Sequence, residues 1–104
     1  MRTQFAVTGV LLLLAAGAQA QNDAKETYRT KCAACHGPDG AGKTTMGRKL
    51  QVEDIRAVVT KHSAEEMIAV VQNGKGERMR AYGKDLNKDQ IKALVEYFRS
   101  LAKP

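Results

Sequence analysis

The sequence predicts an all-α domain of four to five short helices, and three observations lead to that fold class. Apolar residues recur at spacings of three and four along several segments, which is the period of an α-helix. Residues typical of helix starts precede these segments. No run alternates apolar and polar residues in the way that a half-buried strand does. A single small helical domain accounts for this pattern.

Residues 1–20 have the features of a secretory signal peptide. Arg2 gives a positive start, residues 5–14 are apolar, and a small-x-small cleavage pattern ends at Ala20. An uncleaved membrane anchor is the alternative, but the apolar stretch is shorter than the ~20 residues that span a bilayer. We therefore expect cleavage after Ala20, a periplasmic mature domain at 21–104 and no stable membrane insertion after cleavage.

Before residue 50 the sequence predicts one helix and one loop. Residues 23–31 form the helix, which Asn22 or Asp23 can cap. Residues 37–42 contain three glycines and a proline, which favour turns and cannot continue a helix. No strand precedes this glycine-rich stretch, so it does not indicate a phosphate-binding loop. One face of the helix carries residues at four-residue spacing: Ala24, Tyr28 and Cys32.

The remainder of the chain predicts three further helices and an irregular loop. Residues 52–60 form the first helix, and a capping box at residues 63–66 opens the second, which ends at Gly74. The loop covers residues 74–83, and Asn87 then caps the last helix. Five residues give that helix its apolar stripe: Ile91, Leu94, Val95, Phe98 and Leu101.

The pattern Cys32-Ala-Ala-Cys35-His36 is the attachment signal for c-type haem. Two cysteines at this spacing can each form a thioether with one of the two vinyl groups of the porphyrin. The adjacent histidine then lies under the iron and can ligate it through an imidazole nitrogen. The sequence therefore predicts one covalently attached haem c at Cys32 and Cys35, with His36 as an iron ligand.

Three other readings of these residues are weaker. A thioredoxin-like redox pair follows a strand in a βαβ pattern, which the sequence lacks. A zinc site needs four ligands, and His62, the one other histidine, cannot complete the set. A structural disulfide is possible in an exported protein but leaves His36 unexplained.

The second axial ligand of such a haem decides whether the iron is closed or open to small molecules. Met67 falls on the buried face of a helix, where methionine is usually a core residue. Met46 lies in a loop close in sequence to His36, and His62 directly precedes a helix cap. Met79 lies in the 74–83 loop, far enough along the chain to reach the opposite face of the haem.

The mature region resembles the class I c-type cytochromes, and in particular the small bacterial monohaem ones. The resemblance implies the cytochrome c fold, thioethers at Cys32 and Cys35, His36 as proximal ligand and Met79 as distal ligand. Three motifs carry it: Tyr28-x-x-x-Cys32-Ala-Ala-Cys35-His36-Gly37, Asn73-Gly74-Lys75-Gly76-x-x-Met79-x-Ala81-Tyr82 and Ile91-x-x-Leu94-x-x-Tyr97-Phe98-x-x-Leu101.

The resemblance also implies a contact between the first and last helices, with Ala24 and Tyr28 crossing the region of Leu94 and Tyr97. The sequence departs from the family pattern at two places. Arg80 follows Met79 where the family commonly has proline. Residues 44–45 are threonines where the family commonly has a proline whose carbonyl accepts from the proximal histidine.

These features indicate a one-electron carrier between respiratory redox partners, not an enzyme. The alternative is a haem enzyme or gas sensor in which the methionine ligand dissociates. Gas-binding four-helix proteins, however, place the attachment motif near the carboxyl terminus and lack a ligand methionine. We expect a monomer.

The charge of the chain points to the kind of partner that it binds. Seventeen basic and eleven acidic residues give a net charge of +6, which becomes +5 when Arg2 leaves with residues 1–20. The sequence has neither the basic stripe nor the aromatic stacking platform that would indicate nucleic-acid binding. Redox proteins with acidic docking surfaces are therefore the expected partners. Six basic residues are candidates for the docking face: Lys31, Lys43, Arg48, Lys49, Arg78 and Arg80.

Overall fold

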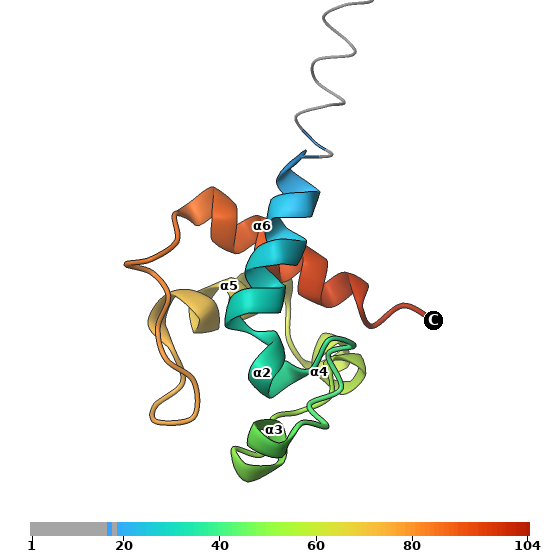
Figure 1. Cartoon of the computed structure of the whole chain (residues 1–104). Helices are drawn as coiled ribbons and strands as arrows, with labels where there is room; N and C mark the ends of the chain where they lie inside the picture. The colour runs from blue at the N-terminus through green and yellow to red at the C-terminus, as the bar shows by residue number, and fades with distance from the viewer. Residues whose placement is uncertain (1–16, 18) are drawn as a thin grey trace, which may run out of the picture.

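The computed structural model describes residue 17 and residues 19–104, and the predicted all-α fold class is confirmed. This part of the chain contains one isolated antiparallel bridge and no strand. A helical segment at 19–31 comes first. Five helices follow it (Figure 1): α2 (Ala33–His36), α3 (Thr45–Lys49), α4 (Ile55–Lys61), α5 (Ala64–Asn73) and α6 (Lys88–Ser100). Most of the predicted signal peptide lies outside the described residues.

The helical segment 19–31 crosses α6 near the middle of the molecule (Figure 1). The ring of Tyr28 lies 5.3 Å from the ring of Tyr97 and 5.6 Å from that of Phe98, measured between centroids. The buried hydroxyl of Tyr28 donates to the carbonyl of Gly37 at 2.5 Å. The expected contact between the first and last helices is therefore present, and it also holds the turn that follows α2.

Two helix starts differ from the prediction. The first helix already runs from residue 19, so residues 22–23 lie inside it and do not cap it. The helix α4 begins later than predicted, at Ile55, because the carboxylate of Asp54 accepts from the backbone N–H of Arg56 and caps the helix there. An N-cap residue has an extended backbone, so α4 cannot continue upstream through Asp54.

The capping boxes that open the last two helices are confirmed. Ser63 Oγ accepts from the N–H of Glu66 at 3.1 Å, and the Glu66 carboxylate accepts in return from the N–H of Ser63 at 3.2 Å. Asn87 and Gln90 make the same reciprocal pair at 2.8 and 2.9 Å. Both signals depend on residues three apart, which is why the sequence alone predicts them.

The core lies between the helical segment 19–31, α5 and α6. The helix α6 packs against both α5 and α4, and its buried residues are Ile91, Leu94 and Val95, as predicted. The other buried members of the cluster are Tyr28, Ile55, Met67 and Leu86. A shell of partly buried apolar side chains, including Cys32, packs against them.

The short helix α3 was not predicted, and it packs directly on α2. Thr44 caps it by accepting from the N–H of Gly47 at 2.8 Å, and the same hydroxyl donates to the carbonyl of Cys35 at 3.0 Å. A methyl group on Gly47 would overlap the carbonyl oxygens of Cys35 and Gly42. Glycine therefore permits the close approach of α3 to α2, although it is a poor helix former.

Candidate haem-binding site

The attachment motif occupies a single helical turn. Cys32 stands at the N-cap of α2, and its carbonyl accepts from the N–H of Cys35 at 3.2 Å and from that of His36 at 2.9 Å. Both thiols are free, and both cysteines are half-buried. The turn thus presents two thiols and an imidazole within five residues, as the motif predicts.

Burial of the Cys32 side chain raises the pKa of its thiol to about 11, and the nearby charge of Lys31 only partly opposes this effect. The side chain packs against the hydrophobic core. Cys32 is therefore a protonated thiol at neutral pH in the folded chain, and not a reactive thiolate.

The imidazole of His36 is held between α2 and α6. Its ring meets the ring of Phe98 edge-on, with 4.9 Å between centroids. Burial lowers the pKa of His36, which favours the neutral imidazole that binds a metal. Together with two free thiols, this donor set fits a c-type haem.

The second nitrogen of His36 has no acceptor in the described part of the chain. Its Nδ1 atom is buried and makes no hydrogen bond there. Thr44, one of the two threonines that replace the family's common proline, uses its hydroxyl on Cys35 and Gly47, and its carbonyl accepts from the N–H of Arg48. Thr44 thus joins α3 to α2 and does not orient the imidazole.

The loop that carries Met79 closes on itself and on the end of α5. The N–H of Lys75 donates to the carbonyl of Met79 at 2.8 Å. At the base of the loop, the N–H of Tyr82 donates to the carbonyl of Val71 at 2.8 Å. Gly74 has a φ of +78°, and a Cβ atom there would lie 2.8 Å from the Met79 carbonyl oxygen, so glycine is required at this turn.

Tyr82 brings this loop to the attachment motif. Its hydroxyl donates to the carbonyl of Lys31 at 3.1 Å, directly before Cys32. Burial raises the pKa of Tyr82, and the proximity of Cys32 adds to the effect. In Figure 1 the loop runs beside α2 and reaches toward α3. Met79 is half-buried within it.

The other three candidate ligands have different surroundings. Met67 is a core residue, as predicted, and its sulfur lies 3.4 Å from a guanidinium nitrogen of Arg99. Met46 lies in α3 and not in a loop, and it is 45% exposed. His62 is exposed, and its Nδ1 lies 3.1 Å from the carboxylate of Glu66.

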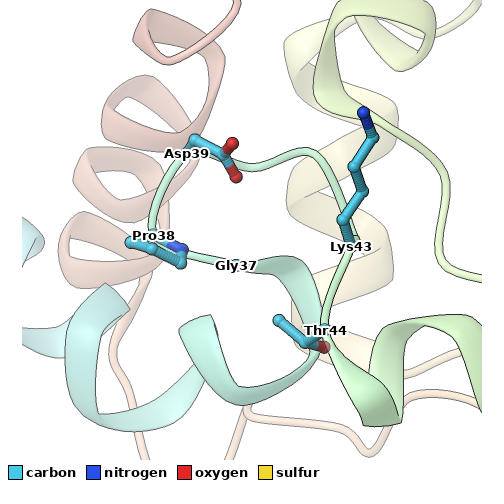
Figure 2. Close-up of a pocket in the computed structure, with 5 residues that line it drawn as sticks. All are labelled: Gly37, Pro38, Asp39, Lys43 and Thr44. Carbon is cyan, nitrogen blue, oxygen red and sulfur yellow. The ribbon is translucent and has the colours of Figure 1, made fainter.

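The loop after the motif contains a shallow pocket of about 430 Å³. Figure 2 shows its five lining residues, with Asp39 and Lys43 on opposite arms of the loop. Lys43 also acts on the carboxylate of Asp54. The pKa of Asp54 is lowered to about 2, mainly by hydrogen bonds with Arg56, and the charge of Lys43 makes the smallest contribution. None of the cysteines, histidines or methionines considered above lines this pocket, so it is separate from the candidate haem ligands.

Two of the six basic residues expected at a docking face also make contacts within the chain. Arg78 donates to backbone carbonyls of residues 50 and 51. Arg80 pairs with Asp85 and lies over the ring of Tyr82 at 4.4 Å. All six side chains are exposed: Lys31, Lys43, Arg48, Lys49, Arg78 and Arg80.

Three contacts around the motif were not predicted from the sequence: Phe98 against His36, Thr44 to Cys35, and Tyr82 to Lys31. Of these residues, Thr44 alone gave a local signal, because threonine is a favoured N-cap residue. The Tyr82 and Phe98 contacts join residues far apart in the sequence, which periodicity and capping patterns do not report.

The fold and the motif together define a cytochrome c domain, and comparison with known proteins gives its family. The family described as cytochrome c oxidase, cbb3-type, subunit III matches residues 19–98. The chain belongs to this family. It is also similar to a solved structure, the KustC0563 c-type cytochrome, with a TM-score of 0.71 and 30% identity over 76% of this chain and 96% of that one.

A curated relative is the cbb3-type cytochrome c oxidase subunit FixP of Azorhizobium caulinodans. It is 32% identical over 76 residues, which are 73% of this chain but 25% of the relative. The chain therefore spans about a quarter of the length of FixP. Within the described residues, no helix has the length and apolar character needed to cross a membrane.

Proposed function

We propose that residues 21–104 form a one-electron carrier with a single haem c, held by thioethers from Cys32 and Cys35. The observation that carries this proposal is the helical turn that presents both free thiols beside a half-buried imidazole whose pKa is lowered by burial. When bound, the haem supplies an iron that gains and loses one electron. Membership of a cytochrome c oxidase subunit family supports the same function.

The chain supplies two axial ligands in this proposal. His36, held edge-on against Phe98, is the proximal ligand. Met79 is the distal ligand, because its loop is fastened beside the attachment motif by the bond from Tyr82 to Lys31. A thioether sulfur favours the ferrous state and closes the iron to outside molecules, which suits electron transfer without a substrate pocket.

The proposed partners are redox proteins with acidic docking surfaces, and the domain acts as a monomer. The exposed basic residues Lys31, Lys43, Arg48 and Lys49 are the candidates for the positive docking face. Because FixP is an oxidase subunit, we propose a terminal oxidase as the class of electron acceptor. Attraction between opposite charges speeds association and weakens as salt rises.

The proposed location is the periplasm, after removal of residues 1–20 as a signal peptide. Amino-terminal analysis of the protein from periplasmic extract is expected to begin at Gln21, because the small-x-small pattern ends at Ala20. Recovery of a protein that starts at Met1 from the membrane fraction would instead support a membrane anchor.

A visible spectrum with and without carbon monoxide tests the carrier against a haem enzyme or gas sensor. With His36 and Met79 both on the iron, the reduced spectrum is expected to stay unchanged when carbon monoxide is added. A shift of the main absorption band in the unmodified protein would favour the alternative function, in which the methionine dissociates to open the iron.

A further inference from the structure

Arg78, the residue directly before Met79, joins the Met79 loop to a distant part of the chain. Its Nε donates to the carbonyl of Leu50 at 3.0 Å, and its Nη2 donates to the carbonyl of Gln51 at 2.7 Å. The guanidinium thus donates two parallel hydrogen bonds to two successive carbonyls. This forked geometry is specific to arginine.

The two carbonyls are available because of how α3 ends. Leu50 stands at the C-cap of α3, and Gln51 follows with a φ of +56°. It is the one non-glycine residue with a positive φ in the described part of the chain. The left-handed turn at Gln51 ends the helix, so the carbonyls of Leu50 and Gln51 lack helical partners. A cation at a helix C-terminus is also favoured by the helix dipole.

The segment that Arg78 grips is itself attached to the haem-binding turn. Thr44 at the start of α3 donates to the carbonyl of Cys35, and the close approach at Gly47 leaves α3 no room to shift toward α2. A continuous path of contacts therefore runs from Cys35 through α3 to Arg78. It connects the His36 side of the proposed site to the Met79 side.

We propose that Arg78 is a positioning residue that holds the Met79 loop closed against α3 and so keeps the Met79 sulfur on the iron. The inference rests on the proposed role of Met79 as distal ligand. Tyr82 holds one side of the loop to the first helix, and Arg78 holds the other side to α3. Without Arg78, the loop loses its link to α3 and keeps its link to the first helix through Tyr82, so it opens more often.

Arg80 provides a matched control on the other side of Met79. It is exposed like Arg78 and carries the same charge, but its contacts are with Asp85 and Tyr82 of its own segment. Its removal changes the charge near Met79 by the same amount and breaks no link to α3. Any effect seen in Arg78→Gln and absent in Arg80→Gln therefore comes from the loss of the hydrogen bonds to Leu50 and Gln51.

The test measures hydrogen exchange and cyanide binding in the oxidised holoprotein. In Arg78→Gln, the amides of Lys75 and Met79 are expected to exchange roughly five to ten times faster, which corresponds to the net loss of about one typical hydrogen bond. Cyanide should bind faster by a similar factor, because it enters when the loop opens. Arg78→Lys should give an intermediate result, and Arg80→Gln should change both rates less than about twofold.

Two results separate the failure of this inference from that of the proposed ligand. If Arg78→Gln exchanges like the unmodified protein, or like Arg80→Gln, Arg78 does not hold the loop and the inference is overturned. If Met79→Ala binds cyanide no faster than the unmodified protein, Met79 is not the ligand. The exchange rates at Lys75 and Met79 then still decide whether Arg78 closes the loop.

Discussion

Replacing Met79 by alanine is expected to remove the weak near-infrared sulfur-to-iron charge-transfer band of the oxidised protein. The same change should open the reduced iron to carbon monoxide. The reduction potential should fall on the order of 100 mV, since each tenfold loss of preference for the reduced state is about 59 mV in a one-electron couple. The physical reason is that a thioether ligand favours ferrous iron. Absorption spectra and a redox titration measure all three changes.

The other two methionines of residues 21–104 serve as controls. Met67→Ala should keep the band and cost about 2–5 kcal/mol of unfolding free energy, because the side chain is 7% exposed in the core. Met46→Ala should keep the band with little loss of stability, since that side chain is 45% exposed. Persistence of the band in Met79→Ala would contradict the ligand assignment.

The double substitution of Cys32 and Cys35 by alanine is expected to abolish covalent attachment of the haem. In the unmodified protein, made with a haem-attachment system, mass spectrometry should show one haem that survives acid–organic extraction. In the double variant the haem should extract completely, and each single variant should keep one thioether. The reason is that the two thiols on this turn are the only cysteines of the chain.

Ala34 lies between the two cysteines and is exposed, so it offers a control in the same turn. Ala34→Ser should retain the covalent haem in full, because it leaves Cys32, Cys35 and His36 in place. Haem that extracts freely from the unmodified protein would refute covalent attachment at these residues.

The sequence predicted those parts of the fold whose signals are local. The capping boxes at Ser63 and Asn87 each need a partner only three residues away, and both occur where predicted. The helix α3 was missed because Gly47 lowers helix propensity, and its reason for being there is a close contact with α2. A contact between two elements leaves no periodic trace in either of them.

The candidate site also has a local part that the sequence predicted and a non-local part that it did not. The motif that ends at His36 is contiguous in sequence and could be recognised directly. The sequence could not show that Arg78 also binds the backbone, because an exposed charged residue has the same sequence signal with or without such a contact. Only the folded chain shows that Arg78 reaches residues 50 and 51.

The crossing of the first helix with α6 has a consequence for the order of maturation. Tyr28 packs against Tyr97 of α6, so this part of the core cannot close before α6 has been synthesised. In the folded chain Cys32 is half-buried, and this burial raises the pKa of its thiol to about 11. We therefore expect a haem to be joined more readily to the open chain than to the folded one, because closure of the core buries this thiol and raises its pKa.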